Sequence, residues 1–314
     1  MHPILHVAVR AARRAGKIIV RHGERLERVH VREKGRNDFV SEVDRMAEDE
    51  IVEAVRRAYP RHRILAEERA SDGEIENAGE KDGAEKNVRE KAAPEKNVRE
   101  KSPDKKPDKK AQQKISDDME WIIDPLDGTA NYLHGHPHYA VSIAVREAGR
   151  LQHAVILDPL RDELFTASRG GGAHLNERRI RVTGQRKLAR AMLATGFPFR
   201  EHADVDAFMR RFRELLPRVS DMRRAGSAAL DLAYVACGRL DGYWEPGLAA
   251  WDIAAGALLV REAGGLVADF SGGQDFLESG EVVAANRYLF NELLHCIAPR
   301  KSSAENAGSE KSPQ

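Results

Sequence analysis

Apolar residues recur every three to four positions in two N-terminal segments, which predicts two amphipathic helices. In residues 4–18, small and aliphatic side chains share one face and basic side chains lie outside it. Residues 44–58 repeat this periodicity. Two more strongly apolar segments, 228–237 and 253–263, are followed by glycine, which is typical of helices that end at a left-handed residue. The pattern therefore predicts four main helices.

Short aliphatic and β-branched runs lie between these helices and predict strands. The runs are 121–123, 140–145, 153–157, 163–166, 192–194, 267–270 and 282–284. Because strands and helices come in mixed order, we expect a layered fold of the α/β or α+β class. A length of 314 residues allows one large domain or two modest ones.

Residues 69–118 depart from this pattern. By composition they contain 13 basic and 13 acidic residues, no aromatic residue, and the heptapeptide EKNVREK twice. Such a segment cannot bury enough apolar surface to offset its ordering entropy. We predict a globular domain over residues 1–298, interrupted by a solvated insertion at 69–118 and followed by a loose tail at 299–314. A partner-binding arm is the alternative for the insertion.

The overall charge excludes some classes of function. Lys and Arg number 51 and Asp and Glu number 50, so the formal net charge is +1. Strong direct binding to nucleic acid is therefore not expected, because counterion release needs a basic excess or a basic face. The sequence has no apolar run long enough for a membrane span and no secretory signal pattern, so we expect a cytoplasmic protein without membrane partners.

Thiol and transition-metal chemistry are not indicated. Cys237 and Cys296 are the only cysteines, too few for a disulfide framework or a zinc cluster. His134, His136 and His138 form a loop-like run without a nearby acidic or cysteine partner, so we interpret them as a surface cluster rather than a zinc site.

The strongest chemical signal is an apolar strand that ends in two acidic residues. The sequence DPLDGT at 124–129 follows the run 121–123 directly. Asp124 and Asp127, with a backbone carbonyl between them, suit a hard cation such as Mg²⁺. Amide groups at a following helix start suit a phosphate. A structural turn is the alternative, but an apolar strand rarely ends in two acids without a counter-ion.

Other acidic residues border apolar segments in the same way. Glu67 and Glu68 follow one apolar stretch, where an exposed strand or helix end is the alternative. Asp252 and Asp44 each lie at a helix start, where capping is the alternative. Taken together, several acids without a histidine or cysteine cluster indicate an oxygen-only metal site, in which Mg²⁺ bridges carboxylates and a substrate phosphate.

Three motifs together resemble the inositol monophosphatase family: the Glu-Glu pair at 67–68, DPLDGT at 124–129 and WDIAAG at 251–256. The resemblance extends over about residues 1–296, without the insertion. The sequence RRAGSAALDL at 223–232 resembles the bacterial branch, which includes a protein associated with transcription antitermination. The long separation between the first two motifs departs from the family pattern, and the excess is the charged insertion.

The resemblance implies an αβαβα sandwich and a homodimer. It implies hydrolysis of inositol monophosphate to myo-inositol and phosphate by metal-activated water, with two or three Mg²⁺ ions. By matching positions, the implied metal ligands are Glu67, Asp124, the carbonyl of Leu126, Asp127 and Asp252. The implied catalytic residues are Asp44, Glu67 and Thr129. The implied substrate contacts are Asp127, Gly128, Thr129, Arg223, Ala228, Glu245 and Asp252. Lys34 matches a basic residue near an extra metal and water.

Two alternative functions remain open. One is a phosphatase for other small phosphate esters, such as fructose bisphosphate or 3′-phosphoadenosine nucleotides. Glu245 favours a neutral polyol over a second phosphate, which would need a cation. The other is an interaction protein of the transcription apparatus, with RNA polymerase antitermination factors as partners and the phosphatase activity secondary.

Overall fold

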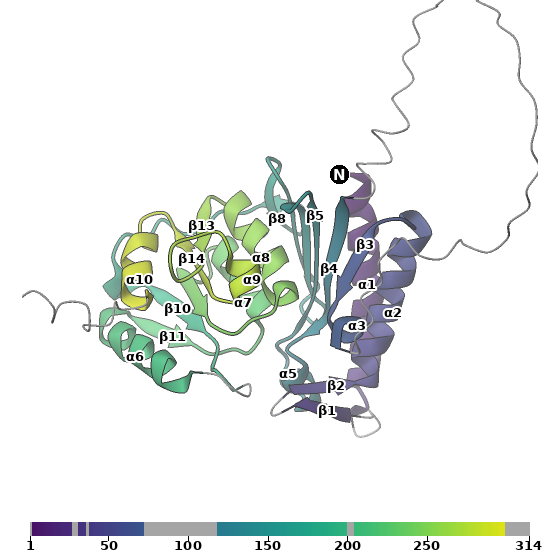
Figure 1. Cartoon of the computed structure of the whole chain (residues 1–314), viewed down its shortest axis with the longest axis horizontal. Coiled ribbons are helices and arrows are strands. Elements are labelled where there is room, and N and C mark those ends of the chain that lie inside the picture. Colours follow the sequence, from purple (N-terminus) through teal and green to yellow (C-terminus); the bar gives the residue numbers. More distant parts are fainter. Residues whose placement is uncertain (1, 27–30, 36–37, 72–117, 200–203, 299–314) are drawn as a thin grey trace, which may run out of the picture.

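A computed structural model describes residues 2–26, 31–35, 38–71, 118–199 and 204–298. Helices and sheets alternate in five layers, which run from right to left in Figure 1. Two N-terminal helices cover a seven-stranded sheet, a middle helical layer follows, and a five-stranded sheet is covered by two further helices. The αβαβα sandwich expected from the sequence is therefore confirmed.

The first layer consists of α1 (Pro3–Gly23) and α2 (Glu42–Ala58). Alanines on the inner face of α1 are fully buried, so the two helices and the sheet can approach closely. Ser41 is the N-cap residue of α2 and forms a capping box with Asp44, in which each side chain accepts a hydrogen bond from the other residue's backbone N–H group. The hairpin of β1 (Val31–Gly35) and β2 (Asp38–Ser41) precedes α2.

The seven-stranded sheet has the order β3-β4-β5-β6-β7-β8-β9. Its strands are β3 (Arg63–Ala66), β4 (Met119–Asp127), β5 (Ala140–Glu147), β6 (Arg150–Asp158), β7 (Glu163–Ser168), β8 (Gly172–Leu175) and β9 (Arg178–Arg179). Strand β3 is parallel to β4, and the other neighbours are antiparallel. All nine residues of β4 are buried because helices cover both faces of the sheet: Trp121 and Ile123 face α1 and α2, while Ile122 faces the middle layer.

The middle layer consists of α7 (Ala228–Ala236) and α8 (Ala250–Glu262). Both helices are apolar almost all round because a sheet lies on each side of them. Gly256 permits their close contact: a Cβ atom there would lie 2.4 Å from the Cβ atom of Leu232. The layer therefore brings the start of α8 close to the end of β4.

The second sheet has the order β11-β10-β12-β14-β13. Its strands are β10 (Met192–Thr195), β11 (Asp221–Arg223), β12 (Gly242–Glu245), β13 (Gly265–Ala268) and β14 (Val282–Asn286). Its outer face packs against α6 (Val205–Leu215) and α10 (Phe290–Ile297) around Phe208 and Trp244. The short elements are α3 (Glu67–Ser71), α5 (Thr129–Leu133), α9 (Phe276–Ser279), η2 (Leu188–Arg190) and η3 (Leu216–Arg218).

The predicted insertion and tail fall largely outside the described residues. Residues 69–71 of the segment expected as an insertion form the end of α3, whereas residues 72–117 and 299–314 are not described. Among the helices of the described ranges, none combines the length and the apolar character needed to cross a bilayer.

Candidate active site

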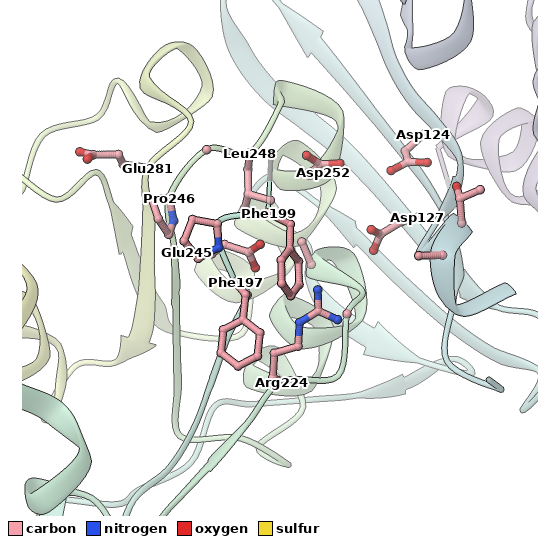
Figure 2. Close-up of a pocket in the computed structure, with 18 of the residues that line it drawn as sticks. Asp124, Asp127, Phe197, Phe199, Arg224, Glu245, Pro246, Leu248, Asp252 and Glu281 are labelled. Atoms are coloured by element: carbon pink, nitrogen blue, oxygen red, sulfur yellow. The ribbon is translucent and has the colours of Figure 1, made fainter. Parts of the chain in front are cut away.

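Acidic side chains from separate parts of the chain converge between the two sheets. Because β3 and β4 are parallel and Ala66 lies opposite Ile123, both strands end at the same edge and carry Glu67 next to Asp124. Asp252 enters from the first turn of α8. Oxygen atoms of Asp124, Asp127 and Asp252 lie within 4.8 Å of one another. Figure 2 shows these three carboxylates facing a common space.

The end of β4 departs from regular strand geometry where the acids lie. The pairing with β5 shifts register between Asp124 and Asp127, and Pro125 cannot donate to the ladder. The N–H group of Leu126 instead donates to Asp124 Oδ1 at 3.0 Å. Gly128 follows with φ of 95°, and a Cβ atom there would lie 3.1 Å from the His138 carbonyl oxygen and 3.2 Å from that of Gly226. This turn directs both carboxylates toward α8.

Backbone and hydroxyl donors hold two of the carboxylates in place. Asp127 Oδ2 accepts hydrogen bonds from Ser227 Oγ at 2.5 Å and from the Ala229 N–H at 2.8 Å, both at the start of α7. Asp252 Oδ2 accepts from the Ala249 N–H at 2.7 Å. Asp252 therefore caps α8 and also faces the other acids, so the capping alternative and the expected site placement are compatible.

Burial and mutual repulsion make this cluster costly to ionise. Burial, with the negative charges of Glu67, Asp127 and Asp252, raises the pKa of Asp124 well above its usual range. Burial, followed by the charge of Asp252, raises the pKa of Asp127 to about 7. Such clusters of buried carboxylates are typical of sites that hold a cation or transfer protons.

A further buried acid, Asp44, contacts this site through Thr129. The hydroxyl of Thr129 lies 2.8 Å from Asp44 Oδ1 and 3.0 Å from the Leu126 carbonyl oxygen. Asp44 Oδ2 accepts from Ser41 Oγ at 2.5 Å and from the Ser41 N–H at 3.0 Å. Burial raises the pKa of Asp44. As with Asp252, one aspartate caps a helix and contacts a candidate catalytic residue.

A cavity of about 480 Å³ opens from the acidic cluster toward the second sheet (Figure 2). Glu245, at the end of β12, points into it. Gly196 lines the wall beside Glu245, and a Cβ atom there would lie 1.8 Å from Glu245 Oε1. Burial raises the pKa of Glu245 to about 7. Of the expected substrate contacts, Asp127, Gly128, Thr129, Ala228, Glu245 and Asp252 line this cavity.

Two of the expected residues, Arg223 and Lys34, are not among the described residues that line the cavity. Arg223 pairs with Asp221 at 2.6 Å on β11, and the described residues that line the cavity include Arg224 rather than Arg223. The guanidinium of Arg224 lies 5.5 Å from the ring centre of Phe197 and 5.2 Å from that of Phe199, which also line the cavity. Lys34 lies in β1, and its side chain is outside the described part of the chain.

The sequence pattern contained little signal for these additional residues. Arg223 and Arg224 are adjacent, and the direction of the chain at the end of β11 decides which one reaches the cavity. Gly196, Phe197 and Phe199 follow β10 in a stretch without polar periodicity.

The donor set fits a hard divalent cation. All candidate side-chain ligands are carboxylates, which Mg²⁺ prefers over nitrogen or sulfur donors. A bound cation would also offset the burial and the mutual repulsion that raise the pKa values of Asp124 and Asp127. Within the described ranges, the only group of acids, histidines or cysteines close enough to share an ion is the one formed by Asp124, Asp127 and Asp252, and no histidine belongs to it.

Comparisons with known proteins agree with this fold. A family model described as the inositol monophosphatase family matches residues 1–303. The chain is 50% identical over 301 residues to a Pseudomonas aeruginosa protein named Nus factor SuhB, covering 95% of this chain and 97% of that protein. Extragenic suppressor protein suhB from Bartonella henselae, known from a crystal structure, is 36% identical in sequence to this chain. The two structures match with a TM-score of 0.77, over 94% of this chain and 98% of that chain. An inositol monophosphatase from Anabaena (Nostoc) sp. PCC 7120 is 32% identical, with a TM-score of 0.69 and coverage of 94% and 96%.

Proposed function

Because the chain belongs to the inositol monophosphatase family, we propose that it is a Mg²⁺-dependent phosphatase that hydrolyses inositol monophosphate to myo-inositol and phosphate. The observation that carries this proposal is the group formed by Asp124, Asp127 and Asp252, which lies at one end of a cavity whose other wall contains Glu245. The acidic end of the cavity can hold cations, which in turn would bind the phosphate group of the substrate. The rest of the cavity suits a small polyol.

We assign the metal to the carboxylates of Glu67, Asp124, Asp127 and Asp252 and to the carbonyl oxygen of Leu126, which together could hold two or three ions. Mg²⁺ bound there would neutralise charge on the phosphoryl oxygens and make a nearby water more acidic. Lys34 stays a prediction for the surroundings of an additional ion.

We assign proton transfer to Thr129 and Asp44. When the Thr129 hydroxyl donates to Asp44 Oδ1, a lone pair of the same oxygen can accept a proton from the attacking water. The hydroxyl proton of Thr129 then moves to Asp44, and the raised pKa of Asp44 favours this transfer. No covalent phosphoenzyme is needed in this reaction.

The other end of the cavity would bind the alcohol. The backbone N–H groups of Gly128 and Thr129 at the start of α5 would contact the phosphate. Glu245 and the backbone of Ala228 would bind hydroxyl groups. We transfer to Arg224 the role at this wall that the resemblance had implied for Arg223, because Arg224 lines the cavity.

Phosphate release with a panel of esters tests the proposal. At fixed Mg²⁺, inositol 1-phosphate should be hydrolysed with a higher kcat/KM than 2′-AMP or glycerol phosphates. A preference for another ester would keep the phosphatase assignment and reject the inositol substrate. Absence of release from every ester, in a protein shown to be folded, would reject the enzyme assignment.

Substitution of Gly196 by alanine tests the polyol contact. The new Cβ atom would overlap the Glu245 carboxylate, and this flexible side chain would move instead of the backbone. Because hydrogen bonds to a charged group contribute about 1.5–3 kcal/mol, we expect KM for inositol 1-phosphate to rise about tenfold or more, with kcat changed much less. Steady-state kinetics measure this, and an unchanged KM would remove Glu245 from the substrate site.

Mg²⁺ binding is expected to release protons near neutral pH. The pKa of Asp127 is about 7 without metal, so this carboxyl group holds a proton below pH 7 that a cation must displace. Burial and the neighbouring negative charges also raise the pKa of Asp124 well above its usual range, which acts in the same direction. The apparent Mg²⁺ affinity should therefore increase as the pH rises from 6 to 8. Calorimetry in buffers with different ionisation enthalpies measures the proton release, and a pH-independent affinity would contradict the prediction.

We also propose a second function, as a component of transcription complexes. The Pseudomonas aeruginosa relative, named Nus factor SuhB, is similar over nearly its whole length, which supports such a role. The partners would be antitermination factors of RNA polymerase, and the chain would act as a homodimer. Pull-down from a bacterial lysate with wild type and Asp124→Asn tests this. Equal recovery of RNA polymerase by both proteins is expected, and recovery of none would reject this second function.

A further inference from the structure

A buried carboxylate outside the cavity contacts the segment that carries Glu67. Glu48 lies on α2, is 2% exposed and does not line the cavity. Its Oε2 accepts a hydrogen bond from the Glu68 N–H at 2.7 Å, and its Oε1 accepts one from the Arg69 N–H at 3.2 Å. The Arg69 Nε atom also lies 3.3 Å from Glu48 Oε1. Glu48 thus binds both residues that follow Glu67.

The segment around Glu67 is a short helix that follows a strand at the sheet edge. Helix α3 is only five residues long, and a single helical turn is not stable without tertiary contacts. Among the described strands, β3 is at the edge of its sheet and pairs with β4. Pairing of Ala66 with β4 holds the residue before Glu67, and Glu48 holds the two residues after it.

The same face of α2 contacts both halves of the acidic cluster. Asp44 and Glu48 are four residues apart and therefore lie one above the other on the helix. Asp44 contacts Thr129, which follows β4, whereas Glu48 contacts the turn that follows β3. Helix α2 therefore connects the ends of the two strands that carry Asp124 and Glu67.

We propose that Glu48 is a positioning residue that holds Glu67 against Asp124 and thereby sets the affinity of the site for its metal. The inference rests on the proposed function for the identity of the metal. A buried carboxylate is suited to this role because it accepts two N–H groups at once and pairs with the Arg69 guanidinium. Glutamine cannot replace it, because the amide NH₂ would face an N–H donor.

Glu48→Gln tests the role, with Glu53→Gln as the matched control. Glu53 lies on the exposed face of the same helix, where its carboxylate pairs with Arg57. In chelator, hydrogen exchange at the amides of Glu68 and Arg69 should become at least about tenfold faster in Glu48→Gln and stay unchanged in Glu53→Gln. Calorimetry with Mg²⁺ alone should show about 10–100-fold weaker binding. At saturating Mg²⁺, kcat should return to within about twofold of wild type.

A milder variant covers the case in which Glu48→Gln does not fold. Glu48→Asp keeps the charge beside Arg69 but is one methylene too short to hold both N–H groups, so it should show the same effects at about three- to tenfold. Unchanged amide exchange at Glu68 and Arg69 would overturn the positioning role by itself. Faster exchange with unchanged Mg²⁺ affinity would overturn the link to the metal. A wild-type protein that binds no Mg²⁺ would overturn the proposed function, together with that link.

Discussion

Replacement of Asp124 by asparagine is expected to lower kcat by about 10³-fold or more while the fold persists. Asp124 interacts with the other acids of the cluster: burial, and then the charges of Glu67, Asp127 and Asp252, raise its pKa. Asparagine has the same shape and can still accept the Leu126 N–H, but it removes one negative ligand. Loss of several kcal/mol of transition-state stabilisation corresponds to this factor, at about 1.4 kcal/mol for each tenfold change.

Two measurements separate this effect from unfolding. In chelator, the melting temperature of Asp124→Asn should equal or exceed that of wild type, because the substitution removes a repelling buried carboxyl group. Added Mg²⁺ should raise the melting temperature of wild type and leave that of the variant unchanged. Asp162→Asn, at an exposed position, serves as the control and should behave like wild type. A variant with near-normal activity would refute the assignment of Asp124 to the metal.

Replacement of Thr129 by valine is expected to lower kcat by about 10²–10⁴-fold, the range typical of a lost general base. Valine is similar in shape but has no hydroxyl group, so the contact with Asp44 Oδ1 and the proposed acceptor for the water proton both disappear. Asp44 keeps its two hydrogen bonds from Ser41, so the start of α2 should remain intact. The Mg²⁺ affinity should change little, since the carboxylates are unaffected.

Thr129→Ser is the matched variant for this prediction. It retains the hydroxyl group and should keep kcat within about tenfold of wild type. Pre-steady-state or steady-state phosphate release at saturating Mg²⁺ and substrate measures the difference between the two variants. Equal losses in the two variants would show that a retained hydroxyl group does not preserve kcat, which would contradict the role assigned to this hydroxyl.

Asp124 and Asp127 also explain why the sequence predicts only part of strand β4. The apolar pattern predicts a strand only over 121–123, whereas β4 continues through Asp124 to Asp127. Charged residues end a hydrophobic pattern, but here helices on both faces bury them within the strand. Departure from the local pattern is expected where residues serve function rather than stability.

Other elements were missed because their own pattern is weak. Strand β9 has two residues and β11 has three, both largely exposed, so neither shows alternation. Helices α6 and α10 are amphipathic but short, and they acquire stability from packing on the outer face of the second sheet. These elements depend on contacts between distant parts of the chain, which periodicity does not contain.

The sequence alone was sufficient to predict the layered fold, because helical and strand patterns alternate along it and the motifs around Glu67, Asp124 and Asp252 together resemble one family. The metal chemistry of the site stays a prediction from the same motifs. Only the folded chain decided that Arg224 rather than Arg223 lines the cavity, that Asp44 and Asp252 cap helices while facing the site, and that Glu48 supports Glu67. Each of these depends on which residues become neighbours when layers pack, and on how far water is excluded between them. Proximity and burial arise from tertiary contacts, so local sequence cannot determine them.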